Sequence, residues 1–163
     1  MAGRPMDAET RAVSDDHGAI RLWLRMLATN RLVETRTRRL LQERYSTTLP
    51  RFDLMAQLER APRGLKMGEL SKRMMVTGGN VTGITDLLEE EGLVERAADP
   101  GDRRAWLVCL TPAGRRAFAA MAEEHERWIV ESFAELSGRE MTTMAALLAR
   151  LKSHVRALEE RDA

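Results

Sequence analysis

Apolar residues recur at helical spacing along most of this chain. From about Gly18 to Tyr45 they form a stripe that predicts a long amphipathic helix. A second helix is predicted from Pro112 toward Leu136, because Thr111 can cap its first amides and proline suits the first helical position. The stripe of the first helix consists of Ile20, Trp23, Leu24 and Leu27.

The last part of the chain carries a longer apolar pattern. Ser137 and Glu140 form a capping box, the arrangement that starts many helices. The apolar positions that follow alternate steps of three and four over more than two heptads, which is typical of a seam between helices. They are Met141, Met144, Leu148, Leu151, Val155 and Leu158.

Two shorter helices are predicted between these long ones. The first runs from Gly68 to Met75, with Leu70 and Met74 facing a core and Lys72 and Arg73 outside. After a turn, a second runs from about Gly78 to Glu91. Its apolar positions are Val81, Ile84 and Leu88, and its opposite face carries Gly79, Asn80, Thr82, Gly83 and Asp86.

That opposite face is small and polar, as a helix that enters the major groove of DNA requires. Small residues let the backbone approach closely, while Asn80, Thr82 and the preceding Thr77 offer hydrogen-bonding groups. Each glycine costs a helix roughly 0.5 to 1 kcal/mol relative to alanine, which is understandable if closeness to a partner matters. The alternative is an ordinary surface helix with a frayed start.

A two-stranded ribbon is predicted after the second short helix. Gly92 is placed as a helix cap, residues 93–96 form a short strand and residues 105–110 the return strand. The connection, residues 97–104, contains the turn signal Asp99-Pro100-Gly101. It also contains Asp102, Arg103 and Arg104; arginine on such a hairpin can enter a minor groove. The alternative is a solvated surface turn.

Together these residues resemble the MarR (multiple-antibiotic-resistance regulator) family of transcription factors. The resemblance covers about residues 20–158 and includes residues 49–54, which are similar to the family's second helix. One departure is Met67-Gly68, where many members have a serine or threonine cap, so packing is expected to hold that helix start. The motif residues are Leu70, Asn80 to Thr82, Leu88-Glu89, Glu91 to Val94, Arg96, Asp102 to Arg104 and Leu110 to Gly114.

The resemblance implies a mainly α fold with a small β-wing, a winged helix-turn-helix whose long terminal helices form a dimerisation region. The expected divisions are a flexible arm (1–17), a first dimerisation helix (18–48), the DNA-binding region (49–111) and C-terminal dimerisation helices (112–163). A homodimer would place two winged motifs on a pseudo-palindromic site in double-stranded DNA. The expected DNA-binding residues are Lys72, Arg73, Thr77, Gly79, Asn80, Thr82, Asp102, Arg103 and Arg104.

The family also implies a small-molecule effector in a cleft between the helical region and the winged domain. The segment Met75 to Gly83 is similar to a subgroup that controls aromatic-acid catabolism and answers to aryl-CoA thioesters such as hydroxycinnamoyl-CoA. Residues 21–45 hold seven arginines and two glutamates, a balance of +5, which suits phosphates. Candidate ligand-binding residues are Trp23, Met26, Arg31, Arg38, Met55, Met74 and Trp128, each of which can equally be core.

Composition excludes some alternatives. The chain has 163 residues, 44% of them apolar, a net charge of +1 and one cysteine, typical of one soluble domain in a reducing cytoplasm. No apolar run predicts a membrane span or a signal peptide. The histidines lack metal-ligand spacing and no catalytic motif is found, so we predict a regulator without enzyme activity, metal or cofactor. Cys109, in an alternating strand, is expected to be an inert thiol.

Three other interpretations remain open at this point. The effector can be a free phenolic or aromatic carboxylate instead of a thioester. The scaffold can be a protein-interaction module that no longer binds DNA, since a fold alone does not determine a function. The regulator can activate transcription instead of repressing it.

Overall fold

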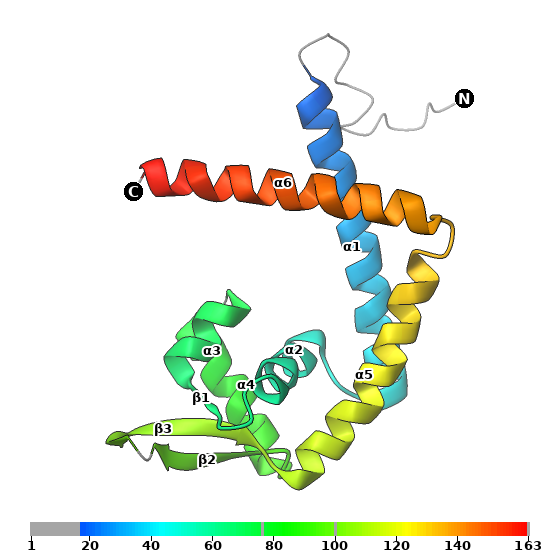
Figure 1. Ribbon diagram of the computed structural model, residues 1–163. Coiled ribbons are helices and arrows are strands. Elements are labelled where there is room, and N and C mark those ends of the chain that lie inside the picture. Colours follow the sequence, from blue (N-terminus) through cyan, green and yellow to red (C-terminus); the bar gives the residue numbers. More distant parts are fainter. Residues whose placement is uncertain (1–16, 76, 100, 163) are drawn as a thin grey trace, which may run out of the picture. The chain divides into compact units, whose positions relative to one another are not determined.

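The computed structural model describes residues 17–75, 77–99 and 101–162, without the side chains of residues 102–105 and 162. Two compact units divide the chain, the first ending at Glu126 and the second beginning at Arg127. The fold is mainly helical with one small antiparallel sheet, as predicted (Figure 1). None of the helices in the described ranges is long and apolar enough to cross a membrane.

The first unit contains the sheet and most of the helices. Its elements are α1 (Gly18–Tyr45), α2 (Leu49–Glu59), β1 (Leu65–Lys66), α3 (Met67–Met74), α4 (Gly78–Glu90), β2 (Val94–Asp99) and β3 (Asp102–Leu110). Helix α5 (Pro112–Ser132) begins in the first unit and ends in the second, which also holds α6 (Gly138–Asp162).

The sheet has three strands in the order β1-β3-β2, whereas the sequence predicted a ribbon of two. Strand β1 pairs antiparallel with β3, with Leu65 opposite Val108. It has only two residues, too few to produce a readable alternation.

The wing strands are longer than predicted. Residues 97–104 were expected to connect them, but Ala97 and Ala98 continue β2 and lie opposite Leu107 and Trp106. The next pair is Asp99 with Asp102. Three residues of β3 therefore lie between the partner of Ala98 and the partner of Asp99, which makes the ladder irregular at this point. Alanine and aspartate are poor strand formers, and the hydrogen bonds of the ladder, not side-chain preference, extend this part of the hairpin.

The hydrophobic core of the first unit lies between α2, the two short helices and the sheet. Leu54, Leu58, Leu70, Val81 and Leu88 are almost completely inaccessible, and so are the β3 residues Val108 and Leu110. Fully burying one such side chain contributes about 1.5–3 kcal/mol. The short helices are therefore held by packing, because helices of their length are marginal alone.

Helix α4 buries the predicted residues Val81, Ile84 and Leu88, and also Thr85. A buried hydroxyl needs a partner, and Thr85 donates to the Val81 carbonyl at 2.8 Å. Gly92 follows with a φ of +69°, and the amides of Gly92 and Leu93 donate to the Glu89 and Leu88 carbonyls. This is a Schellman motif, which confirms the predicted helix end.

The remaining helix boundaries follow local signals, with two differences. Glu69 accepts a hydrogen bond from the Lys66 amide at 3.1 Å, so a carboxylate holds the start of α3, where packing was expected. Helix α5 ends at Ser132 and not near Leu136, because Phe133, Ala134 and Leu136 make tighter i to i−3 bonds. The caps of α5 and α6 are as predicted, with Thr111 accepting from Gly114 and Ser137 exchanging bonds with Glu140.

Candidate nucleic-acid interface

Helices α3 and α4, with the turn between them, form a helix-turn-helix. Leu70 is buried as predicted, whereas Met74 is only half-buried. Met75 ends α3 in a left-handed conformation with a φ of 54°, and its side chain is 93% exposed. Lys72 and Arg73 are exposed in the last turn of α3. Two cations therefore directly precede the turn that leads into α4.

One face of α4 is exposed and carries small or polar residues. All five residues predicted for it are exposed: Gly79, Asn80, Thr82, Gly83 and Asp86. Among the described atoms, nothing lies within 4 Å of a Cβ added at Gly79 or Gly83. The backbone of α4 can therefore come close to a partner over its first two turns, as a helix in the major groove must.

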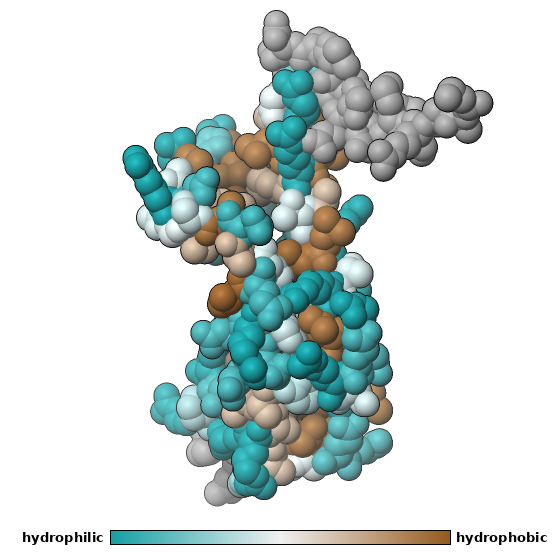
Figure 2. Space-filling view, turned by 90° about the vertical axis from the view of Figure 1, so that its right-hand side faces the viewer, coloured by the Kyte–Doolittle hydropathy of each residue, from teal (hydrophilic) through white to brown (hydrophobic). Residues whose placement is uncertain are grey.

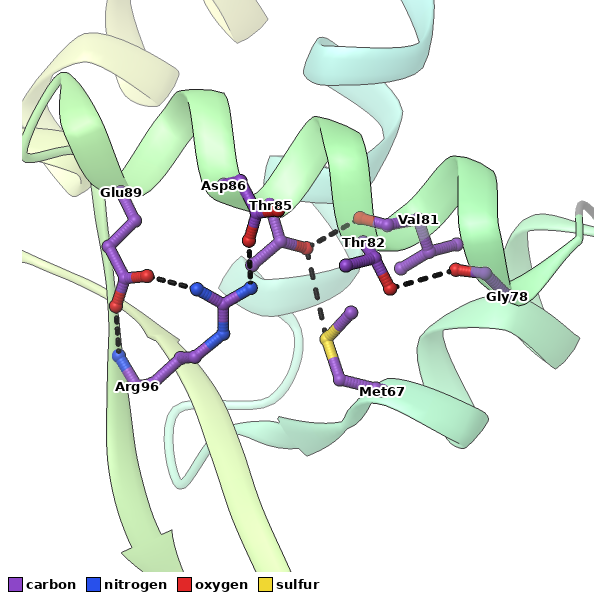
Figure 3. Close-up of polar contacts among 8 residues, drawn as sticks. All are labelled: Met67, Gly78, Val81, Thr82, Thr85, Asp86, Glu89 and Arg96. Carbon is purple, nitrogen blue, oxygen red and sulfur yellow. Dashed lines mark hydrogen bonds and ion pairs between the residues drawn. The ribbon is translucent and has the colours of Figure 1, made fainter.

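The polar groups at the start of α4 differ in what they offer. Thr77 stands exposed at the N-cap in extended conformation, and its carbonyl accepts from the Asn80 amide at 3.1 Å. The Thr82 hydroxyl donates back to the Gly78 carbonyl at 3.0 Å (Figure 3). In the free protein Thr82 therefore presents lone pairs and a methyl group, and the Asn80 side chain supplies both a donor and an acceptor.

The wing is the hairpin formed by β2 and β3. At its turn, the Asp99 carboxylate accepts from the Gly101 amide at 2.9 Å and pairs with the Lys66 ammonium at 3.1 Å. The predicted DNA contacts Asp102, Arg103 and Arg104 lie in β3, but their side chains are outside the described part of the structure.

An ion-pair cluster that sequence reasoning did not assign to the site joins the wing to α4. Arg96 on β2 pairs with both Asp86 and Glu89 of α4 (Figure 3). The hydrogen bond to Asp86 raises the pKa of the Arg96 guanidinium. Asp86 and Glu89 are three residues apart, which places them on one side of a helix, so the spacing was a readable signal.

The seven candidate ligand residues are distributed over several elements. Met55 belongs to the core at 1% exposure, and Met74 lies at the end of α3. Trp128, which is 3% exposed, lies in the second unit. The other four, Trp23, Met26, Arg31 and Arg38, extend over about 22 Å of α1 at 1.5 Å per residue.

At least three of the seven arginines of α1 are paired with carboxylates. Arg38 pairs with Glu34 and Arg39 with Glu43, each one turn away. Arg44 pairs with Glu124 of α5 at 2.8 Å. Arg31 is exposed. Asp53 of α2 is exposed, and partial desolvation of its carboxyl, followed by the nearby Glu34, raises the pKa of that carboxyl.

Cys109 lies on β3, half-buried and close to Gly64. Burial raises the pKa of its thiol, which keeps the thiol protonated and unreactive. Gly64 has a φ of +86°, and a Cβ there would lie 2.5 Å from the Cys109 sulfur. The raised pKa agrees with the predicted inert thiol, although the alternating strand was typical of a fully buried one.

The fold and the exposed helix define a winged-helix DNA-binding protein, and comparison with known proteins defines the family. Residues 45–105 match the model of the MarR family. A solved MarR family transcriptional regulator from Silicibacter pomeroyi is 34% identical, with a TM-score of 0.74 over 87% of this chain and 99% of that one. The chain belongs to the MarR family of transcriptional regulators.

Two further relatives have names that indicate regulation. The HTH-type transcriptional regulator PecS of Dickeya dadantii is 32% identical over 69% of each chain. The transcriptional activatory protein BadR of Rhodopseudomonas palustris is 26% identical over 98% of this chain and 93% of that protein. Regulators of this type are not enzymes.

Proposed function

We propose that this protein is a cytoplasmic, ligand-responsive repressor that binds a pseudo-palindromic operator as a homodimer. The observation that carries the proposal is the exposed face of α4, where open glycines and polar side chains lie next to the cationic end of α3. Small residues permit close approach, asparagine and threonine can read base edges, and lysine and arginine attract phosphates. The predicted wing contacts Asp102, Arg103 and Arg104 are part of this proposal.

Homodimerisation is supported by an apolar surface on α6. Five residues of the predicted seam are exposed, among them Leu151 at 43%, and further apolar residues are exposed on α1. Apolar patches are visible on the molecular surface in Figure 2. A surface of this kind is expected to be covered by a partner. The exposed seam residues are Met141, Met144, Leu148, Leu151 and Val155.

The effector we propose is an aryl-CoA thioester, such as a hydroxycinnamoyl-CoA, that releases the operator upstream of genes for aromatic-acid catabolism. The sequence of the segment from Met75 to Gly83 supports the subgroup, and the exposed Arg31 can meet a phosphate. Pairing of Arg38 and Arg39 with carboxylates reduces this support, and favours the alternative of a free aromatic carboxylate. Because the relative BadR is named a transcriptional activatory protein, activation is the alternative to repression.

DNA binding can be tested with duplexes from the region upstream of the protein's own gene. We expect fluorescence anisotropy to show tight binding to one such duplex and much weaker binding to a scrambled duplex. Lys72→Ala, which removes a phosphate contact, should make the dependence of log K on log salt less steep, by about one unit of slope. Equal binding to all duplexes, or to none, would contradict the proposed function and favour a protein-interaction module.

The effector can be tested by calorimetry on the dimer with and without operator. Hydroxycinnamoyl-CoA, the free acid and coenzyme A are titrated separately. Linkage requires a reciprocal effect. Bound operator must lower the protein's affinity for the effector by the same factor by which the bound effector lowers its affinity for operator, typically about 5- to 150-fold. Binding of the free acid alone would replace the thioester, and binding of none would indicate regulation without these effectors.

A further inference from the structure

Arg96 connects the wing to α4 through two carboxylates (Figure 3). Its guanidinium donates through Nη1 to Glu89 and through Nη2 to Asp86. Its backbone amide donates to the other oxygen of Glu89 at 3.2 Å. One residue of β2 thus makes three hydrogen bonds to a stretch of α4 that covers one helical turn.

Helix α4 is also linked to the wing at the end of the helix. Leu88 and Val94 are buried, and the Schellman motif at Gly92 closes the turn between the helix and β2. The first six residues of α4 include three glycines, which stiffen a helix least. Arg96 is attached to α4 at Asp86, between this glycine-rich start and the anchored end.

We propose that Arg96 is a positioning residue for DNA recognition, which holds the exposed face of α4 at a set distance and angle from the wing so that both reach one operator together. The inference rests on the proposed function and names the residue that couples its two reading elements. Arg96 itself need not touch DNA.

The shape of the guanidinium matters for this role as much as its charge. A single exposed ion pair contributes little to stability, but a guanidinium shared by two carboxylates belongs to a network with defined geometry. Lysine keeps the charge but lacks the planar fork that spans both partners. The hydrogen bond to Asp86 raises the pKa of Arg96, so the guanidinium remains charged at the pH values at which the protein is folded.

The same strand is attached to α3 at its other end. Asp99, the last residue of β2, pairs with Lys66, whose amide caps α3 through Glu69. Strand β2 is therefore linked to both helices of the helix-turn-helix, once in its middle and once at its tip. This arrangement supports a wing that is fixed relative to the helices.

A purely electrostatic role makes the opposite prediction for one variant. If Arg96 only masked the negative charge of Asp86 and Glu89, replacing both by Asn and Gln would remove repulsion from phosphates and tighten DNA binding. If Arg96 positions α4, the same double variant loses the anchor and binds operator more weakly, although it carries less negative charge.

The experiment compares Arg96→Met, Arg96→Lys and the double variant Asp86→Asn with Glu89→Gln. Each full-length protein is titrated with a duplex that the wild-type protein selects from a random pool, and with a scrambled duplex, at several salt concentrations. Arg44→Met is the matched control, because it breaks a 2.8 Å pair with Glu124 that joins α1 to α5. Thermal unfolding shows that each variant is folded.

All three variants should bind the selected duplex roughly 10-fold more weakly, as expected for the loss of hydrogen bonds to charged groups. In Arg96→Lys, which keeps the charge, binding to the scrambled duplex and the salt slope should stay near wild type, and Arg44→Met should behave as wild type. Operator binding by the double variant that equals or exceeds wild type would overturn the inference. So would a slope lowered by about one unit in Arg96→Met with equal weakening on both duplexes, which indicates a phosphate contact. Failure of the proposed function would appear separately, as a wild-type protein that selects no duplex.

Discussion

Single residues decide how closely the segments of the first unit can pack, and Gly114 is the clearest case. It lies in the first turn of α5, where an added Cβ would be 1.9 Å from the Leu93 carbonyl oxygen. That carbonyl also accepts from the Thr111 amide at 3.1 Å, so it cannot move without disturbing the helix cap.

We expect Gly114→Ala to lower the free energy of unfolding by about 1–3 kcal/mol, the usual cost of overpacking. Urea unfolding followed by circular dichroism measures this. Gly138→Ala is the control, because among the described atoms none lies within 4 Å of a Cβ at Gly138. Equal unfolding midpoints for Gly114→Ala and wild type would show that the contact relaxes freely.

Gly83 lies on the exposed face of α4, where a larger residue should stabilise the fold but weaken DNA binding. Because its Cβ would meet no described atom, Gly83→Ala should raise the free energy of unfolding by about 0.5–1 kcal/mol through helix propensity. The same methyl would keep the helix away from the groove and weaken operator binding by about 1–3 kcal/mol. Urea unfolding and fluorescence anisotropy test the two halves. Unchanged operator affinity would place Gly83 away from DNA.

At the scale of elements, the contact between α2 and α5 depends on a histidine. The His125 ring of α5 lies 4.8 Å from the Phe52 ring of α2, measured between centroids, and Phe118 packs on the same phenylalanine at 5.4 Å. Burial lowers the pKa of His125 below 6.5, so the folded protein holds the neutral ring.

The sign of the resulting pH dependence follows from linkage. The unfolded chain binds the His125 proton more tightly, so this contribution to stability is complete above about pH 6.5 and is lost as the pH falls through the folded-state pKa. We expect His125→Phe to flatten the decline of unfolding free energy between pH 7.5 and 5.5. Chemical denaturation at several pH values measures it, and an unchanged slope would contradict the prediction. The carboxyl of Asp53, whose pKa is raised by desolvation, contributes to this pH dependence with the opposite sign.

At the scale of the whole molecule, the apolar stripe of α6 implies a second copy of the chain. Leu151→Asp would place an unpaired carboxylate in the proposed interface and should cost several kcal/mol of association free energy, yielding monomers or unfolded chains. Sedimentation velocity at micromolar concentration measures this. Ser153→Asp, two residues away and on the other side of the helix, is the control and should remain dimeric. A wild-type monomer would contradict the proposed assembly.

The sequence by itself determined the features that depend on neighbours along the chain. The helix periods, the caps at Thr111 and Ser137 and the Schellman glycine at Gly92 are set by residues a few positions apart, and each is present in the structure. The buried and exposed faces of α4 were predictable for the same reason.

Only the tertiary structure decided the features that join distant segments. Strand β1 exists because Leu65 lies opposite Val108, and the wing is longer than its side chains suggest because backbone pairing continues past the apolar positions. The fork of Arg96 and the burial of His125 against Phe52 likewise depend on contacts between separate elements. Local patterns do not encode such contacts, because their free energy is gained only when the elements pack together.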